Sequence, residues 1–124
     1  MPISSYSRDK LQNHEFGGAA YVQPSAWFVK LHLGDPGVNC TANPAANTTR
    51  AAVTFSGSSA GSDPSASAAS WTSVSTSETY AWVSLWDNAT GGNPLRYGQL
   101  TTPVAVTAGA SFTIPSGQLT CTLT

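Results

Sequence analysis

The chain has 124 residues and a formal net charge of −1, and only 9% of its residues are charged. An average soluble domain carries roughly 25%. No basic stripe is present to neutralise phosphates, so nucleic acid is not an expected partner. No apolar run is long enough for a membrane-spanning helix, and the opening residues lack the apolar core of a secretory signal peptide. The hydrophobic content of 40% predicts a single domain with its own packed core.

Serine and threonine take the place of the missing charges. Helix surfaces are usually rich in Glu, Lys and Arg, whereas a Ser/Thr/Val/Gly-rich chain is typical of strands joined by many turns. Strand-like segments recur at short intervals after residue 20. The sequence therefore predicts an all-β fold, an antiparallel β-sandwich of about seven or eight short strands preceded by a short α-helix.

The N-terminal segment, SSYSRDKLQNHEFGG, differs from the rest. Ser4 or Ser5 can cap a helix and the Gly17–Gly18 pair can end it, which predicts a helix over about residues 5–15. We expect residues 1–20 to form a helical docking segment and residues 21–124 to form the β-sandwich domain. The docking contacts expected in this segment come from Tyr6, Leu11 and Phe16.

The stretch WFVKLHLGDPG, which begins at residue 27, alternates like a strand and ends in a turn. The residues expected to face the core are Trp27, Val29, Leu31 and Leu33. Phe28, Lys30 and His32 are expected on the outer face. Lys30, His32 and Asp35 could be parts of an active site, but a catalytic set needs a third group and an enclosed pocket. We therefore expect an outer sheet face, with Asp35 capping the turn.

Further strands are predicted over residues 50–55, 71–74, 79–86, 95–102, 103–106, 111–114 and 118–124. The segment 95–102 should pair antiparallel with 79–86. Residues 38–49 read as a loop and residues 56–70 as a flexible connection. Within 79–86, one face should carry Ala81, Val83 and Leu85. The other face should carry Tyr80, Trp82, Ser84 and Trp86.

Metal, cofactor and catalytic sites are not expected. The loop residues Asp87, Asn88, Thr90 and Asn93 could present oxygens to Ca²⁺, but their spacing is not that of a calcium loop, and a hairpin connection is the simpler reading. No G-x-S-x-G elbow is present, and the acidic residues are too scattered for a glycosidase pair. Cys40 and Cys121 are expected to be free, partly buried thiols, with a disulfide as the alternative.

Aromatic residues are more numerous than one small core requires. Seven of them are considered for surface roles: Trp27, Trp71, Trp82, Trp86, Phe28, Tyr80 and Tyr97. They can fill two apolar layers, anchor a protein interface or stack on sugar rings. With the helix residues named above, Phe28, Trp82 and Trp86 are the candidate interface residues.

Two segments resemble a known family. One is WFVKLHLGDPG followed by TTRAAVTF; the other is WVSLWDNATGGNPLRYGQLTTPVAVTAGASFTIPSGQLTCTL. Their order and spacing are similar to those of small virion proteins of tailed bacteriophages, particularly phages of actinobacteria. Members of this family are described as capsid decoration or fibre proteins and as minor tail proteins. The resemblance implies a structural role in the virion, assembled in the host cytoplasm, and no enzyme activity.

Three functions follow as expectations. The first is a capsid decoration protein that binds the outside of the shell of phage major capsid protein. The second is a minor tail or tail-fibre protein that contacts the host surface. The third is a carbohydrate-binding β-sandwich that takes a host-surface glycan. Self-association into a homo-oligomer is expected, with a trimer as one arrangement.

Overall fold

The computed structural model describes residues 1–122, which form one helix and eight strands. The elements are α1 (Ser5–Glu15), β1 (Trp27–His32), β2 (Ala51–Val53), β3 (Ser62–Pro64), β4 (Ala69–Trp71), β5 (Glu78–Trp86), β6 (Pro94–Val106), β7 (Phe112–Ile114) and β8 (Thr120–Thr122). Residues 123 and 124, which the sequence assigned to the last strand, lie outside the described range. No helix in the described part of the chain is long and apolar enough to cross a membrane.

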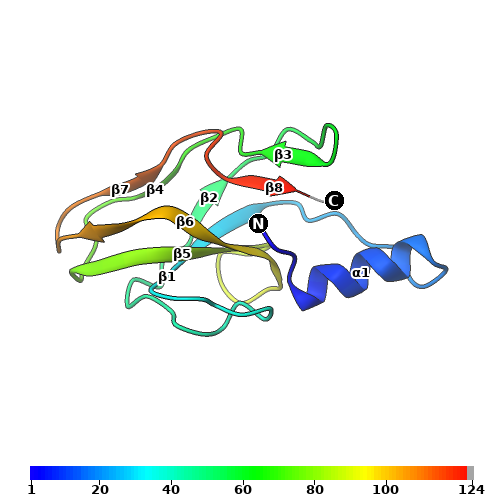
Figure 1. Ribbon diagram of the computed structural model, residues 1–124, viewed down its shortest axis with the longest axis horizontal. Coiled ribbons are helices and arrows are strands. Elements are labelled where there is room, and N and C mark those ends of the chain that lie inside the picture. The colour runs from blue at the N-terminus through cyan, green and yellow to red at the C-terminus, as the bar shows by residue number, and fades with distance from the viewer. Residues whose placement is uncertain (123–124) are drawn as a thin grey trace.

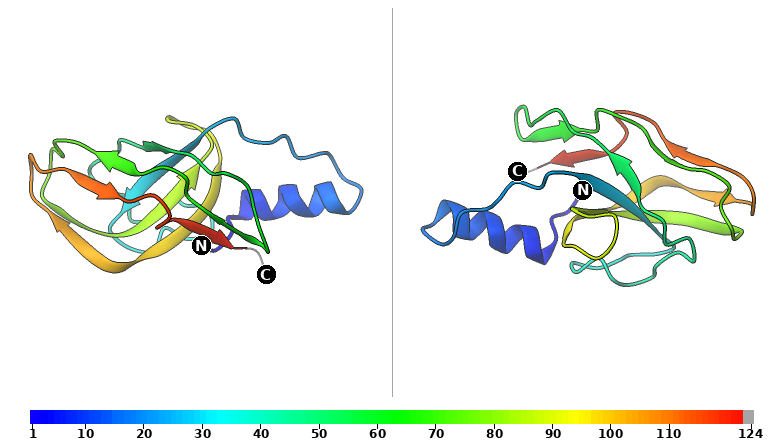
Figure 2. Two further views of the ribbon diagram at one scale, coloured as in Figure 1. Left: turned by 90° about the horizontal axis from the view of Figure 1, so that it is seen from above. Right: turned by 180° about the vertical axis from the view of Figure 1, so that it is seen from behind.

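The strands form two antiparallel layers, as predicted (Figures 1 and 2). One layer is a four-stranded sheet in the order β2-β1-β5-β6, and the other consists of the two-stranded ribbons β3-β8 and β4-β7. Apolar side chains from both layers meet between them and exclude water, which is the main stabilising contribution in a fold of this kind. The principal members of this core are Val29, Leu31, Val53, Trp71, Tyr80, Val83, Leu85, Phe112 and Ile114.

The predicted helix is confirmed, and so are both of its end signals. Ser4 is the N-cap, and its Oγ accepts a hydrogen bond of 3.1 Å from the Ser7 amide. The same hydroxyl donates to the Pro94 carbonyl at 2.6 Å, which fixes the start of α1 to the start of β6. Gly17 has a φ of +91°, a conformation that reverses the chain and that glycine adopts without strain. From this fixed start α1 extends away from the β-domain (Figure 1).

The expected burial of two residues in the first predicted strand is wrong. His32 is fully buried, although it was expected on an open outer face, and Leu33 is 44% exposed, although it was expected in the core. The chain after β1 folds back alongside the end of that strand: the Leu33 amide donates to Asn43 and the Ala45 amide donates to Leu31. This return places the Ala42 carbonyl against the His32 ring. This returning loop covers His32 and ends the alternation one residue earlier than predicted.

The face assignment in β5 is also partly wrong. Tyr80 is fully buried in the core with Val83 and Leu85, although strict alternation places it with Trp82 on the opposite face. The pairing with β6 shifts between Tyr80 and Trp82, which oppose Val104 and Gln99 respectively. Such an irregularity changes which face a side chain points to, and the period-two pattern cannot reveal it.

Residues 56–70 are more ordered in structure than predicted, because they contain β3 and the beginning of β4. Ser65 lies between these strands and is buried; its amide donates to Leu119, and its Oγ accepts from the Gly117 amide. Residues 95–102 and 103–106, predicted as separate strands, belong to the single long strand β6. Residues 56–70 form strands because they pair with distant parts of the chain. Local composition gives no sign of such pairing, so the segment was predicted to be a flexible connection.

Replacing Leu31 with alanine should lower the free energy of unfolding by about 2–5 kcal/mol, because the side chain is fully buried between the layers and its removal leaves a cavity. Urea denaturation measures the change. Val22→Ala is the matched control, since Val22 is 84% exposed, and it should change stability by less than about 0.5 kcal/mol. Equal losses in the two variants would contradict the placement of the core.

Candidate functional site

A buried polar cluster lies on the outer face of the four-stranded sheet, beneath the loop that follows β1. His32 Nε2 lies 2.7 Å from Ser84 Oγ, and His32 Nδ1 lies 2.9 Å from the Ala42 carbonyl oxygen. Trp86 Nε1 donates to Ser84 Oγ at 2.8 Å. A carbonyl oxygen can only accept, so Nδ1 carries the proton of the neutral ring and Nε2 accepts from the Ser84 hydroxyl. Every polar group in this chain of bonds is therefore paired.

The environment of His32 favours its neutral form. Burial lowers the pKa of His32, and the positive charges of Lys30 and Arg50 lower it further, while the hydrogen bond to the Ala42 carbonyl opposes them. The cluster therefore holds an uncharged imidazole between a strand and a loop.

The Ser84–His32 pair has the distance of a catalytic dyad but not the surroundings of one. Both side chains are fully buried, so no substrate carbonyl can approach the hydroxyl. The group that orients the imidazole is the carbonyl of Ala42 and not a carboxylate, so no negative charge is present to stabilise an imidazolium ion as in a catalytic triad. The hydroxyl also already accepts from Trp86. This geometry ties the loop to the sheet.

Trp86 is packed under cationic side chains. It is 8% exposed, and the Arg50 guanidinium lies 4.1 Å from its ring centroid, with Lys30 at 5.9 Å. Arg50 Nη1 also donates to the carbonyls of Asn88 and Gly91, both at 2.7 Å. The arginine therefore clamps the loop between β5 and β6 onto the ring, and Trp86 does not present an open surface.

The loop after β5 is a closed hairpin connection. Asp87 Oδ1 accepts from the Asn93 amide at 2.7 Å, and Oδ2 accepts from Asn93 Nδ2 at 3.1 Å. The carboxylate is thus occupied within the loop, and residues 1–122 contain no group of three potential metal-binding side chains. Asp35 Oδ1 accepts from the Gly37 amide at 2.8 Å, which is the turn cap that the sequence indicated.

The two cysteines are free, as expected. Cys40 is buried within the loop that follows β1, and Cys121 is partly buried on β8. Burial raises the pKa of the Cys40 thiol to about 11, so it stays protonated and is a poor nucleophile.

The six candidate interface residues lie in two places. Phe16 is 76% exposed at the end of α1, and Leu11 is half-buried. Tyr6 packs edge-on against Tyr21, with ring centroids 6.4 Å apart. The second place is the outer face of the sheet, where Phe28 and Trp82 are half-buried and Trp86 is buried. Of these six side chains, the one at the helix end is the most accessible.

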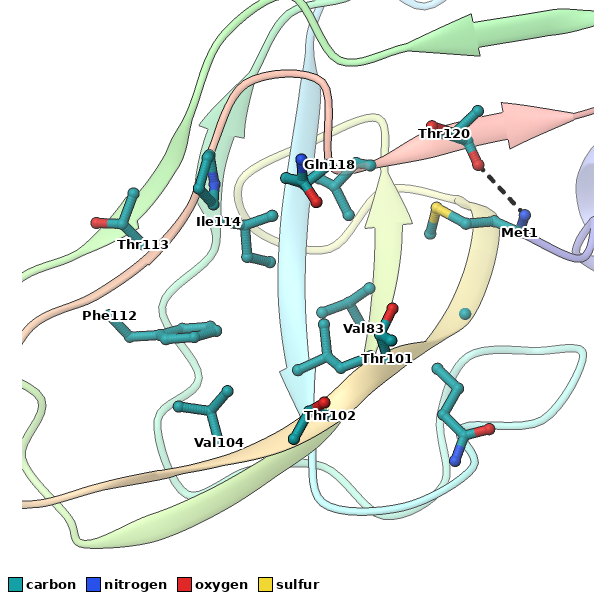
Figure 3. Close-up of a pocket in the computed structure, with 15 residues that line it drawn as sticks. Met1, Val83, Thr101, Thr102, Val104, Phe112, Thr113, Ile114, Gln118 and Thr120 are labelled. Atoms are coloured by element: carbon teal, nitrogen blue, oxygen red, sulfur yellow. Dashed lines mark hydrogen bonds between the residues drawn. The ribbon is translucent and has the colours of Figure 1, made fainter.

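A groove that no sequence pattern predicts lies between β6 and the segment from β7 to β8 (Figure 3). Its volume is about 430 Å³, and its walls carry threonine hydroxyls, glutamine amides, aliphatic groups and the ring of Phe112. No Asp, Glu, Lys or Arg side chain lines it, so it offers a largely neutral surface with an apolar floor. The charged group beside it is the Met1 amine, which donates to the Thr120 carbonyl. The groove lies where the pairing of β5 with β6 is irregular, and that irregularity cannot be read from composition.

Taken together, a sealed polar cluster and a neutral groove on a small β-sandwich are features of a protein that works by contact. The family model described as podophage GP4 fiber I protein gp80 matches residues 2–122. The chain belongs to this family and is a structural protein of a phage virion. The expected virion family is thereby supported, whereas its narrower assignment to phages of actinobacteria is not. No curated protein matches the sequence.

Acidification should destabilise the protein through His32. The folded state lowers the pKa of His32 from its ordinary value of 6.5, so the unfolded chain binds the proton first as the pH falls. This contribution to stability is complete above about pH 6.5 and decreases below it. Urea denaturation at about pH 7.5 and about pH 5.5 should show the loss in the wild-type protein. His32→Gln should remove this component, whereas the exposed control His14→Gln should retain it; an unchanged dependence in His32→Gln would contradict the assignment.

Gly92→Ala should destabilise the hairpin loop by about 1–3 kcal/mol. Gly92 has a φ of +72°, and a Cβ there would lie 2.5 Å from Asp87 Oδ1 and 2.6 Å from the Asn88 Cβ. Gly91→Ala is the control: its φ is +64°, but its Cβ would meet no atom within 4 Å. Thermal unfolding should show a larger loss for Gly92→Ala, and equal losses would show that the crowding at Asp87 is unimportant.

Proposed function

We propose that this protein is a subunit of a fibre on the virion surface that acts through binding. The family match over residues 2–122 carries the proposal, because the description of the matched family names a fibre protein. The physical character of the chain agrees with such a role. Few charged side chains and a β-domain with its polar cluster sealed suit a protein that stays folded while exposed on a particle.

The protein, in this proposal, has no catalytic centre. The one Ser–His pair described above is inaccessible, and its imidazole is held neutral. The groove beside β6 has no acid or base among its lining side chains, and the Met1 amine beside it is engaged with the Thr120 carbonyl. It can therefore hold an uncharged segment but supplies no side chain for proton transfer.

A capsid decoration protein is the second candidate. It is favoured by the organisation of residues 1–122, in which a short helix precedes one compact β-domain and no long fibrous stretch occurs. If the protein decorates the capsid, its partner is the phage major capsid protein and α1 is the docking element. Binding of a host-surface glycan has less support. Of the seven aromatic residues considered for it, Trp71, Tyr80 and Trp86 are buried, and Trp27, Phe28, Trp82 and Tyr97 are only half-exposed.

Cryo-electron microscopy of purified virions that carry an epitope-tagged copy tests the location. Antibody label confined to fibres at the tail or its attachment site would support the fibre role. Label distributed over the whole head would overturn it in favour of decoration. Absence of the protein from purified virions would overturn both. Virions with the untagged protein serve as the control for antibody specificity.

A further inference from the structure

The N-terminal arm, residues 1–15, is held to the β-domain almost entirely by its first five residues. Ile3 faces Arg96 in an antiparallel bridge. On either side of this bridge, the Ser4 amide donates to Leu95 at 3.0 Å and the Tyr97 amide donates to Pro2 at 3.2 Å. This short piece adds a strand to the free edge of β6, a recurring way in which an extended segment binds a sheet.

Further bonds complete the anchor. The N-terminal amine of Met1 donates to the Thr120 carbonyl at 3.3 Å, which Figure 3 shows beside the groove. The Ser5 amide donates to Val38 at 2.9 Å. Ser4 is fully buried, and its hydroxyl bonds to Pro94. The edge of β6 therefore recognises this particular segment through its backbone and through one buried hydroxyl.

Beyond residues 1–5, which anchor the arm, the arm makes few contacts with the β-domain. Ser7 is the one buried residue of α1, and residues 12–20 are exposed. A cavity of about 200 Å³ remains between the helix and the domain, lined by Leu11 on one side and by Trp27 and Phe55 on the other. Helices are normally stabilised by burial of an apolar face, and this helix buries little of its surface against its own domain.

The segment that joins the arm to β1 has the character of a hinge. The Phe16 amide donates to Gln12 and the Gly18 amide to Asn13, so both bonds are local. Gly17 adopts a left-handed backbone conformation, which reverses the chain at this point. The same glycine would not require this conformation if the segment were extended. Exposed apolar side chains lie at the same place, with Phe16 at 76% and Val22 at 84%. Fully extended, residues 16–26 span roughly 35 Å, enough to reach a neighbouring molecule.

We propose that the arm is exchanged between copies of this chain, so that residues 1–15 of one copy add to β6 of a second copy. Exchange re-forms the hydrogen bonds that residues 1–5 make with the β-domain within one molecule, so the anchor loses nothing. The bonds of the Gly18 amide to Asn13 and of the Tyr21 amide to His14 belong to the turn that opens. It also opens the turn at Gly17 and brings Phe16 and Val22 of one copy against the domain of another. The occupant of the β6 edge in the assembly is thus the arm of a second copy.

A disulfide across the bridge tests the exchange. Ile3 and Arg96 form a non-hydrogen-bonded antiparallel pair, whose Cα atoms lie roughly 4.5 Å apart, a separation that a disulfide can span. The double variant I3C/R96C is made in the full chain with Cys40→Ala and Cys121→Ala, oxidised, denatured and run on a non-reducing gel. Exchange predicts covalent dimers or larger closed species, and a covalent monomer overturns it.

The matched control is S70C/T113C in the same background. Ser70 and Thr113 face each other across β4 and β7 within one domain, with their hydroxyls 3.2 Å apart, so this pair should give only a monomer. The native mass of the wild-type chain, measured by light scattering over a range of concentrations, completes the test. A mass that stays monomeric overturns the proposal, and so does an oligomer in which I3C/R96C gives no link between copies.

Discussion

The hydroxyl of Ser84 is the contact on which the outer side of this fold depends. It donates to His32 on the neighbouring strand and accepts from Trp86 on its own strand, and His32 in turn donates to the loop at Ala42. One side chain thus connects two strands and a covering loop in a place where water cannot reach. A buried polar group without a partner costs about 1–3 kcal/mol, so the sheet and the loop must form together for these groups to be satisfied.

Closing the outer face in this way determines which surfaces remain for function. Trp86 is covered by Arg50 and no longer available as an anchor. Beyond the bridge between Ile3 and Arg96, the outer edge of β6 remains accessible. So do the groove beside it and the helix that extends from the domain (Figure 1). These surfaces are suited to recognition of polypeptide by shape and backbone hydrogen bonds, and this agrees with a structural protein of a virion.

Local signals in the sequence located the helix and most of the strands but missed β3, and they did not determine every face. The cap at Ser4 and the glycine at 17 give the helix its ends, and alternation from Trp27 gives β1. Tyr80 was misplaced because the shifted pairing between β5 and β6 has no local signature. The burial of His32 depends on Ser84, which is 52 positions away along the chain, and on a polar loop that composition makes look like an open turn. The groove beside β6 was missed for the same reason, because it exists only once the irregular strand is in place.

The stability of Ser84→Ala tests the central claim most directly. If the hydroxyl is the structural link described above, its removal leaves the Trp86 indole and the His32 ring without their partner. The free energy of unfolding, measured by urea denaturation near neutral pH, should then fall by about 1–3 kcal/mol. Ser58→Ala, at an exposed position, should change it by less than about 0.5 kcal/mol. Active-site groups are often held at a cost to stability, so an unchanged or increased stability of Ser84→Ala would contradict the account.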